Sequence, residues 1–444
     1  MTPLQDARRV SLLLGLLFGL AGMGSSSAAI ALPAVASEFD TSVGVAAWTI
    51  SAYVLFLAVA TPVYGRVSDL VGVRIPLLVG VGLMTVGALG ATVATSFELL
   101  LGARVLQGAG AAAVPTLGVT VLSARYEGEV RGLALGRLAA VAAAVSCVGP
   151  LVGGAVEHAV DWRAVMALPV LGLLVLPFLW QTVAGGGSGA RLDLVGAVLV
   201  AGTSAGLVMV VQSPSTGVVV AAVGAALLVL GTPLVARRVR RHPHGFLPAS
   251  VIRNGTVVRS ALAAAAMPAS WFAMLVGVPA ALVDDGWAAW EVGVLLLPSA
   301  VVALVVPRAT SRLLAARGGP QTLVVAALVA AGSLLVSALA TAQAWPVAVS
   351  VAVVLTTFAF GLGQPAMIAT VSDTVPDVVR GAALGIASLV FLVGGSVGSA
   401  VVAGLGEVLG IPGSLLVLAV LPLLGILAIA PDVRRDRAGA VAPR

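Results

Sequence analysis

Arg104 is the residue whose position most strongly suggests chemistry, because it lies within an apolar stretch. The segment ARVLQGAGAAAVP places Gln107 three residues after it, followed by Gly108 and Gly110. A guanidinium inside an apolar helix is costly, and such groups generally face a cavity or a polar partner and take part in function. The alternative is that Arg104 extends outward to water, since Glu98 lies only six residues earlier. Arg104 and Gln107 are therefore candidates for contact with a substrate.

Three hydroxyl groups and one amide offer further polar contacts within apolar stretches. Ser25, Ser26 and Ser27 follow one another in the first such stretch. They could line a polar cavity or bond Arg104, or they could bond carbonyls of their own helix, which is the commoner behaviour. Gln364 precedes Pro365 in a later stretch, where a polar and kinked site is expected.

Carboxylates are absent from the middle third of every predicted span, although proton coupling needs a group that titrates. The remaining candidates lie near span ends, where a helix-end or loop role is the alternative interpretation. They are Asp284, Asp285, Glu98, Glu407 and Asp373.

The chain lacks the sequence patterns of an enzyme or a metalloprotein. There is no H-E-x-x-H motif, and Ser146 and Cys147 have no histidine or buried aspartate nearby in sequence to activate them. Three histidines without a cysteine cluster give no metal-site spacing, and one cysteine cannot form an internal disulfide. We therefore expect no enzymatic activity, no metal and no cofactor; a sensor that binds a ligand without moving it is a remaining alternative.

The composition is that of a membrane protein. Of 444 residues, 60% are hydrophobic and 9% are charged, too few charges for a soluble globule of this size. All basic residues are arginines, and all except Arg104 and Arg163 fall at span ends that are predicted to be cytoplasmic. The net charge of +6 therefore reflects membrane topology and contact with lipid head groups, and no nucleic-acid partner is expected.

The intervals between charged residues predict fourteen transmembrane helices with both termini in the cytoplasm. Two intervals are of double length and are broken by turn-forming residues at Gln212–Gly217 and Thr341–Pro346. The first interval, 10–37, imitates a signal peptide, but its length favours an uncleaved helix. The weakest prediction is the short interval 292–307.

The domain organisation follows from an internal repeat. A shift of 249 residues places EVRGLALG, which begins at Glu129, on VVRGAALG, which begins at Val378, and Gly149 on Gly398. Two six-helix bundles with a substrate site between them are one transporter architecture, and chance similarity of Ala- and Gly-rich helices is the alternative. The predicted segments are an N-terminal bundle at 1–190, an inserted hairpin at 191–236, a basic cytoplasmic loop at 237–259, a C-terminal bundle at 260–431 and a cytoplasmic tail at 432–444.

Two glycine-rich segments indicate conformational change. Glycines in GRVSDLVGVR permit a tight turn, and its charges could form an ion pair in one conformation only. In the fifth helix, Pro150 removes a helical hydrogen bond and the neighbouring glycines allow close helix packing. The predicted gating residues are Gly65, Asp69, Gly72, Arg74, Arg131, Gly136, Gly149, Pro150, Gly153, Gly154 and Arg380.

Together these segments resemble the major facilitator superfamily, and in particular its fourteen-helix drug:proton antiporter branch, which includes the tetracycline exporters of Gram-positive bacteria. GRVSDLVGVR is similar to the family's G-x-L-x-D-R-x-G-R-R loop, RVLQGAG to its R-x-x-Q-G-x-G motif, and the segment from Gly136 to Gly154 to its antiporter motif. The resemblance also covers IALPAVASEF and LDLVGAVL. It implies that Asp69 faces the region of Arg380, and that Arg104 serves proton coupling or substrate contact.

The resemblance implies a monomeric, multi-pass exporter in a bacterial plasma membrane that exchanges small amphipathic compounds or antibiotics for protons. Two acids of the family pattern are missing: Gly24 and Ser25 stand where the branch carries an acid in its first helix, and Ser146 and Cys147 stand where some members have an acid just before the glycine-proline pair. The alternative is an uncoupled facilitator or a lipid-precursor translocator with the same fold. Without an acid, Arg104 would leave a positive cavity that favours anionic or neutral compounds.

Overall fold

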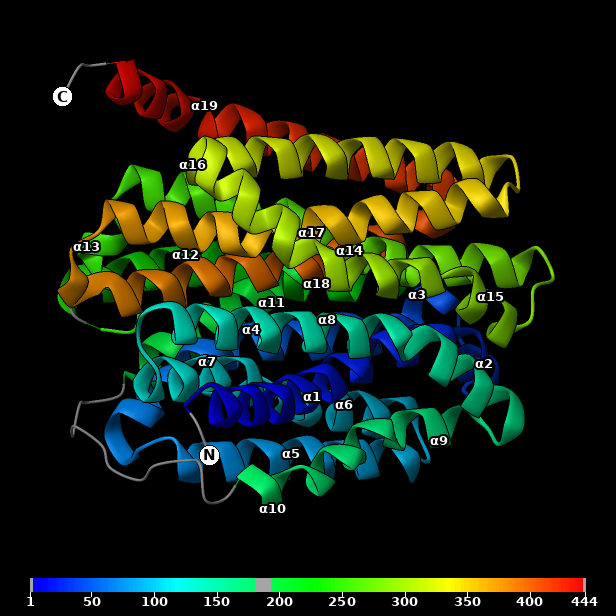
Figure 1. The fold of residues 1–444 in the computed structure, drawn as a ribbon. Coiled ribbons are helices and arrows are strands. Elements are labelled where there is room, and N and C mark those ends of the chain that lie inside the picture. The colour runs from blue at the N-terminus through cyan, green and yellow to red at the C-terminus, as the bar shows by residue number, and fades with distance from the viewer. Residues whose placement is uncertain (1–2, 180–192, 244, 442–444) are drawn as a thin grey trace. The chain divides into compact units, whose positions relative to one another are not determined.

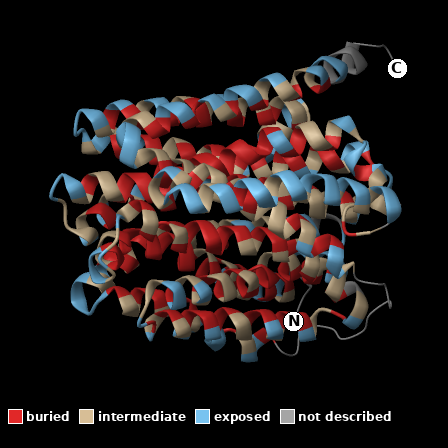
Figure 2. Ribbon diagram, turned by 180° about the vertical axis from the view of Figure 1, so that it is seen from behind, coloured by how far each residue is buried: buried red, intermediate tan, exposed pale blue. Residues whose placement is uncertain are grey.

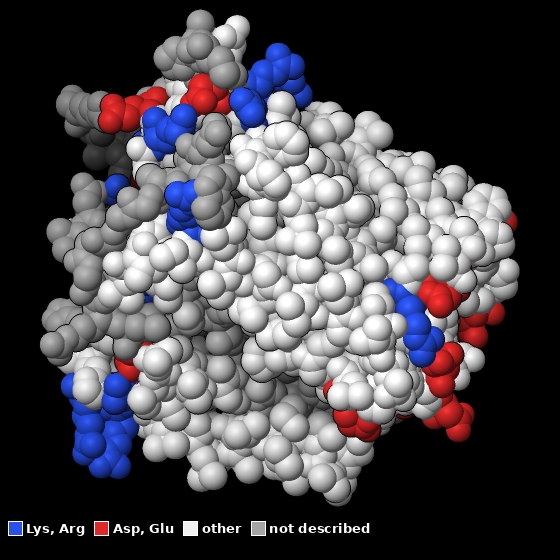
Figure 3. Space-filling view, turned by 90° about the horizontal axis from the view of Figure 1, so that it is seen from below, with Lys and Arg blue, Asp and Glu red and all other residues white. Residues whose placement is uncertain are grey.

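The structure, a computed structural model, describes residues 3–179, 193–243 and 245–441, and most of these residues are helical. Within these ranges there is no β-strand, and twelve helical segments are long and apolar enough to cross a membrane. Few side chains at the helix surfaces are charged, and the face in Figure 3 is mostly free of acidic and basic groups. The predicted all-α membrane fold is confirmed.

Two compact units make up the chain, and neither is continuous in sequence. Unit 1 comprises Met1–Leu192 and Pro279–Val305, and unit 2 comprises Asp193–Val278 and Val306–Arg444. The division falls inside two long helices, so each unit contains part of α14 and part of α16. The predicted domain boundaries stay a prediction, and residues 180–190 of the predicted sixth span lie outside the described residues.

Unit 1 is built around the pairing of its first helix with the helix that carries Pro150. These two, α1 and α8, lie side by side along most of their length (Figure 1). In the same unit, α6 packs against both α5 and α4. The elements of unit 1 are α1 (Pro3–Ile30), α2 (Leu32–Glu38), α3 (Val43–Ala46), α4 (Trp48–Val71), α5 (Arg74–Thr92), α6 (Phe97–Ala111), α7 (Ala113–Arg125), α8 (Gly128–Ala159), α9 (Trp162–Ala167), η1 (Leu168–Leu174), α10 (Leu176–Leu179) and α15 (Ala289–Leu295).

Charged pairs fix the two ends of unit 1. At the end that carries the N-terminus, Asp6 of α1 accepts hydrogen bonds from Arg125 Nε at 2.9 Å and from the Tyr126 hydroxyl at 2.7 Å. At the other end, Glu38 pairs with Arg163 at 2.9 Å, and that guanidinium stacks over the Trp162 ring. Such exposed pairs contribute little stability, but they set where neighbouring helices end relative to one another.

Unit 2 contains the remaining long helices, several of which bend at glycine. Gly217 separates α11 from α12 with φ 92°, and non-helical residues Gly318 and Gly410 interrupt α16 and α18. α16 ends and α17 begins at the predicted break near Pro346. The elements are α11 (Leu194–Thr216), α12 (Val218–Arg241), α13 (Ala249–Ile252), α14 (Gly255–Asp284), α16 (Leu297–Ala342), α17 (Pro346–Thr374), α18 (Asp377–Leu418) and α19 (Val420–Val441).

Burial differs sharply between helices, as Figure 2 shows by colour. In unit 2 most of α14 is buried, whereas α12 has a single buried residue, Gly224, and packs mainly on α11. An apolar helix with an apolar exposed face is the expected arrangement next to lipid, because hydrocarbon is as apolar as the side chains themselves. Asp432 of α19 is buried and ties that helix to α14 through Arg259 Nε at 2.8 Å and the Thr256 hydroxyl at 2.7 Å.

Candidate functional site

Arg104 is the eighth residue of α6, and its side chain points into unit 1. Its side chain is fully buried, so it does not extend to water. Arg104 Nε donates a 3.0 Å hydrogen bond to the Thr49 carbonyl of α4, and Nη1 donates to Gln107 Oε1. The guanidinium also lies 4.5 Å from the centre of the Tyr53 ring, within the range of a cation–π interaction. The sequence pair Arg104 and Gln107 is thus one hydrogen-bonded group.

The glycines of the same segment explain how α6 approaches its neighbours closely enough for these contacts. A Cβ atom at Gly108 would lie 2.2 Å from the Tyr53 carbonyl oxygen, so no larger residue fits against α4 there. On another face, a Cβ at Gly110 would lie 2.3 Å from the backbone nitrogen of Met84 in α5. Backbone-to-backbone packing of this kind is typical of membrane helices. It places Arg104 beside Thr49 and Tyr53.

The guanidinium and amide are not fully paired. Arg104 Nη2 and Gln107 Nε2 are both buried and have no hydrogen-bond partner. Among the residues that the structure describes, no carboxylate forms a salt bridge with Arg104. Gly24 of α1 lies next to this group, since a Cβ at Gly24 would be 3.3 Å from Gln107 Nε2 and 3.6 Å from the Tyr53 hydroxyl oxygen.

The three serines of α1 do not bond Arg104. Ser25 and Ser27 donate to carbonyls of their own helix, at Gly22 and Met23. Ser26 instead donates a 2.7 Å hydrogen bond to the carbonyl oxygen of Ser146 on α8. The Ser146 carbonyl is the one that Pro150 leaves without a helical donor, because proline at position i has no N–H for the carbonyl at i−4.

Glycines form a close contact between α1 and α8 along several turns. A Cβ at Gly149 would meet the Ser26 hydroxyl at 2.0 Å, and one at Gly153 would lie 2.8 Å from the Ser27 Cβ. On the opposite side of the contact, Gly19 and Gly22 of α1 face Val145 and Ser146. The glycines of α8 that were predicted to allow close helix packing therefore contact α1, within unit 1.

The last glycine of the segment faces a different helix. A Cβ at Gly154 would lie 2.5 Å from the carbonyl oxygen of Ala289 in α15. From the other side, a Cβ at Gly293 would lie 2.8 Å from the Pro150 carbonyl oxygen. The backbones of α8 and α15 therefore touch at Pro150–Gly154, and α8 is held between α1 and α15.

The second copy of the repeat packs in the same way within unit 2. Gly398 of α18 corresponds to Gly149, and a Cβ there would lie 1.9 Å from the Ala269 carbonyl oxygen of α14. One turn earlier, a Cβ at Gly394 would lie 2.2 Å from the Ala265 carbonyl oxygen. The same register of small residues thus joins one pair of helices in each unit.

The structure says less about the other predicted gating residues. Gly72 ends α4 with φ 82°, a conformation that favours glycine, and Gly65 has only ordinary contact with Thr116. The side chain of Asp69 lies outside the described residues, so its expected position facing the region of Arg380 stays a prediction. The remaining members are an exposed Arg131, half-buried Arg74 and Arg380, and Gly136, which has open space beside it.

The candidate carboxylates all lie at exposed positions: Asp284, Asp285, Glu98, Glu407 and Asp373. Gln364 is half-buried on α17. Asp432, which was not predicted from the sequence, is the only carboxylate that is buried within the described residues. Its position at the end of an apolar interval identified a helix end and gave no sign of the partner Arg259, which is distant in sequence.

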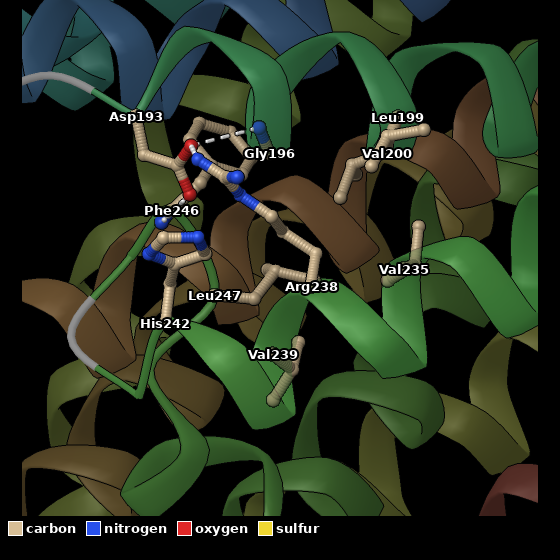
Figure 4. A pocket seen from close by; sticks show the side chains of 10 residues that line it. All are labelled: Asp193, Gly196, Leu199, Val200, Val235, Arg238, Val239, His242, Phe246 and Leu247. Atoms are coloured by element: carbon tan, nitrogen blue, oxygen red, sulfur yellow. Dashed lines mark hydrogen bonds and ion pairs between the residues drawn. The ribbon is translucent and has the colours of Figure 1, made fainter.

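A second charged group joins the start of α11 to the end of α12 in unit 2. It was not predicted from the sequence. Asp193 accepts hydrogen bonds from Arg238 Nη2 at 2.7 Å, from the Gly196 N–H at 3.0 Å and from the Phe246 N–H at 3.0 Å (Figure 4). Burial alone would raise the pKa of Asp193, but these three donors outweigh it and lower that pKa to about 2. We call this group the Asp193 clasp.

Within the described residues, the helical fold and the twelve apolar spans are those of a polytopic membrane protein. The family model for the Major Facilitator Superfamily matches residues 14–377. The chain belongs to this family, as the sequence motifs predicted.

Individual relatives are similar over parts of the chain. The chain is 32% identical over 161 residues to an uncharacterized MFS-type transporter, Rv1250, of Mycobacterium tuberculosis, covering 35% of this chain and 28% of that protein. It is 32% identical over 166 residues to the efflux pump dotC of Dothistroma septosporum, covering 37% and 28%. It is 25% identical over 275 residues to YvkA, an uncharacterized MFS-type transporter of Bacillus subtilis, covering 61% of each. The chain thus matches well under two thirds of the first two proteins.

Solved structures support the fold over the whole chain. A crystal structure of a POT family transporter in complex with 5-aminolevulinic acid has a TM-score of 0.67, with 13% sequence identity and coverage of 97% of this chain and 96% of that one. At this identity the likeness concerns the fold alone.

Proposed function

We propose that this protein exports small amphipathic compounds or antibiotics across a bacterial plasma membrane by alternating access, in exchange for protons. The observation that carries the proposal is the packing of α8, whose Gly149 and Gly153 face α1 and whose Gly154 faces α15. Smooth backbone contacts on both sides let a helix change its packing without moving large side chains. Export as the direction is supported by the antiporter motif in this helix and by the efflux pump among the relatives.

The proposal includes fourteen membrane crossings with both termini in the cytoplasm. Two of the twelve apolar segments, Ala289–Ala342 and Val379–Arg435, are 54 and 57 residues long, far more than one crossing needs. Each contains a glycine with non-helical backbone angles, Gly318 or Gly410. Counting each as two crossings gives the predicted number, and α11 with α12 then supplies the two inserted crossings.

Arg104 is the proposed contact for the transported compound. A buried guanidinium with no carboxylate beside it attracts negative charge and repels cations, so anionic or neutral amphipathic compounds are favoured over dications. Gln107, Ser25, Ser26 and Gln364 are the further candidates for polar contact. We expect the protein to act as a monomer among membrane lipids, with no nucleic-acid partner.

Proton exchange requires a titrating group, for which Asp284 and Asp285 are the proposed residues. Asp284 is the last residue of α14 and Asp285 follows it, and both are exposed. One observation favours the second candidate function, an uncoupled facilitator or lipid-precursor translocator: the only buried carboxylate of the described residues, Asp432, is already engaged by Arg259 and Thr256. An uncoupled protein has no need of a free buried acid.

Transport into proteoliposomes separates the two functions. The purified chain is reconstituted with an acidic interior, and uptake of an anionic fluorescent amphiphile, a neutral one and a quaternary ammonium dye is followed. Exchange for protons predicts accumulation of the anionic or neutral probe above its external concentration, and loss of this accumulation when an ionophore collapses the pH gradient. Equilibration without accumulation supports the facilitator, and no uptake of any probe contradicts both.

The probes are the compounds against which expression of the chain protects a drug-hypersensitive host. Cells that express the chain are compared with cells that express Arg104→Ala at equal membrane abundance. Strong protection against quaternary ammonium dyes that is unchanged in Arg104→Ala would contradict the proposed role of Arg104.

A further inference from the structure

Two buried donors at one place in unit 1 have no acceptor. Arg104 Nη2 and Gln107 Nε2 are enclosed, and neither has a hydrogen-bond partner. Nearly all buried polar groups in native proteins are paired, and an exception commonly indicates a bound water or ion. Because Arg104 Nη1 is bonded to Gln107 Oε1, the two open donors belong to the same hydrogen-bonded group.

The charge of this group indicates what the missing partner is. The guanidinium keeps its proton and has donors only. Within the described residues no carboxylate pairs with it, and its other neighbours are the Thr49 carbonyl and the Tyr53 ring, which are neutral. A water molecule would satisfy the hydrogen bonds but not the charge, and a buried charge is stable only when it is compensated.

The space beside the donors restricts the size of the partner. Gly24 of α1 lies directly beside the donors, because a Cβ there would lie 3.3 Å from Gln107 Nε2 and 3.6 Å from the Tyr53 hydroxyl oxygen. On the far side the same Cβ would lie 3.0 Å from Pro169 Cγ. These distances are tight even for one methyl group, so on the side of Gly24 the donors have room only for a small partner.

We propose that Arg104 and Gln107, beside Gly24 of α1, bind a small monovalent inorganic anion of the size of chloride. The ion neutralises Arg104 and accepts hydrogen bonds from Nη2 and Nε2. This site goes beyond the proposed export function, because it holds an inorganic ion in unit 1 while no transported compound is bound, and a compound that contacts Arg104 displaces the ion.

Thermal unfolding of the purified full chain in detergent tests the proposal. The protein is compared in sodium chloride and in sodium gluconate at equal ionic strength, with sodium bromide as a second halide. Binding to the folded state predicts that either halide raises Tm by about 2–4 °C in a saturable way. Arg104→Gln and Gln107→Leu are each expected to abolish this increase. An equal Tm for the wild-type protein in all three salts overturns the proposal.

A matched pair of variants at Gly24 tests the position of the site. Gly24→Asp attaches a carboxylate next to the two donors, and Gly24→Asn adds a side chain of the same size without the charge. Either new side chain must displace Pro169 slightly, so the loss of stability from this displacement is similar in the two variants. We expect a Tm that no longer depends on chloride in either variant, and a higher Tm for Gly24→Asp than for Gly24→Asn. An undiminished chloride response in both variants overturns the assignment to this site.

Further salts distinguish a free ion from an acid group of the transported compound. If formate or a larger carboxylate raises Tm but chloride and bromide do not, the resident inorganic ion is excluded. Because Tm is measured without any transported compound, this test stands apart from the export assay. If export is not observed but Tm still depends on halide, the proposed function is contradicted and the anion site is supported.

Discussion

Ser26 of α1 donates its hydroxyl hydrogen to the Ser146 carbonyl oxygen of α8 over 2.7 Å, and this is the carbonyl that Pro150 leaves unpaired. The proline therefore does more than weaken its own helix. It makes an acceptor available in the middle of an apolar span, and a neighbouring helix supplies the donor. Gly149, one residue before the proline, provides the room that the Ser26 side chain occupies.

The first prediction concerns the strength of this bond. Ser26→Ala should lower the free energy of unfolding by about 1 kcal/mol, because it leaves a buried carbonyl without a donor. Unfolding of the purified protein in a mild denaturant series measures the change. Ser25→Ala is the control, since Ser25 donates only to its own helix at Gly22.

Pro150→Ala provides the more specific comparison for the same bond. Alanine restores the N–H to which the Ser146 carbonyl would bond within α8, so Ser26→Ala should cost less in that background than in the wild type. An equal cost in both backgrounds would show that the Ser26 hydroxyl does not compensate for the proline.

The second prediction concerns the contact of α8 with α15. Gly154→Ala should reduce the transport rate severalfold at normal membrane abundance, because the new Cβ would lie 2.5 Å from the Ala289 carbonyl oxygen and would force the helices apart. Gly132→Ala is the matched control: it makes the same change in the same helix, where no atom lies within 4 Å. Equal transport by the two variants would contradict a role for close α8–α15 packing.

The sequence predicted helices well because their signal is local. Apolar intervals between charges identified the spans, and turn residues identified breaks such as the one before Pro346. Arg104 was recognisable because a charge in an apolar interval is unusual. What the sequence could not supply was the partner of each group: nothing local indicates that Ser26 meets Ser146, or that Gly24 lies beside Gln107. Asp432 and Asp193 were missed for the same reason, since their arginine partners are distant in sequence.

The third prediction concerns the geometry of Arg104. Arg104→Lys should reduce the transport rate by about tenfold or more, although the charge is kept. Lysine has one ammonium group and cannot bond both the Thr49 carbonyl and Gln107 while it lies flat on the Tyr53 ring. Transport by proteoliposomes with equal protein content measures the loss. Arg163→Lys, at an exposed pair with Glu38, should transport normally; a similar loss in both variants would mean that the effect is not specific to Arg104.

The final prediction concerns pH and the Asp193 clasp. The pKa of Asp193 is lowered to about 2 by Arg238 and two backbone N–H groups, from an unfolded value near 3.8. A carboxylate whose pKa is lower in the folded state stabilises the fold above the unfolded pKa, and that contribution is lost as the pH falls from about 4 to about 2. Its size is at most about 2 kcal/mol, because Asp193 and Arg238 are partly exposed and solvent screens them.

Asp193→Asn removes the charge at every pH and so isolates this contribution. The variant should have a lower Tm than the wild type at pH 7, and the difference should shrink as the pH is lowered through 4 towards 2. Asp161→Asn is a suitable comparison, because Asp161 accepts the N–H of Ala164 at its own helix start and forms no ion pair with an arginine within the described part of the chain. A Tm difference for Asp193→Asn that stays constant from pH 7 to pH 3 would show that the ionised carboxylate does not hold α11 to α12.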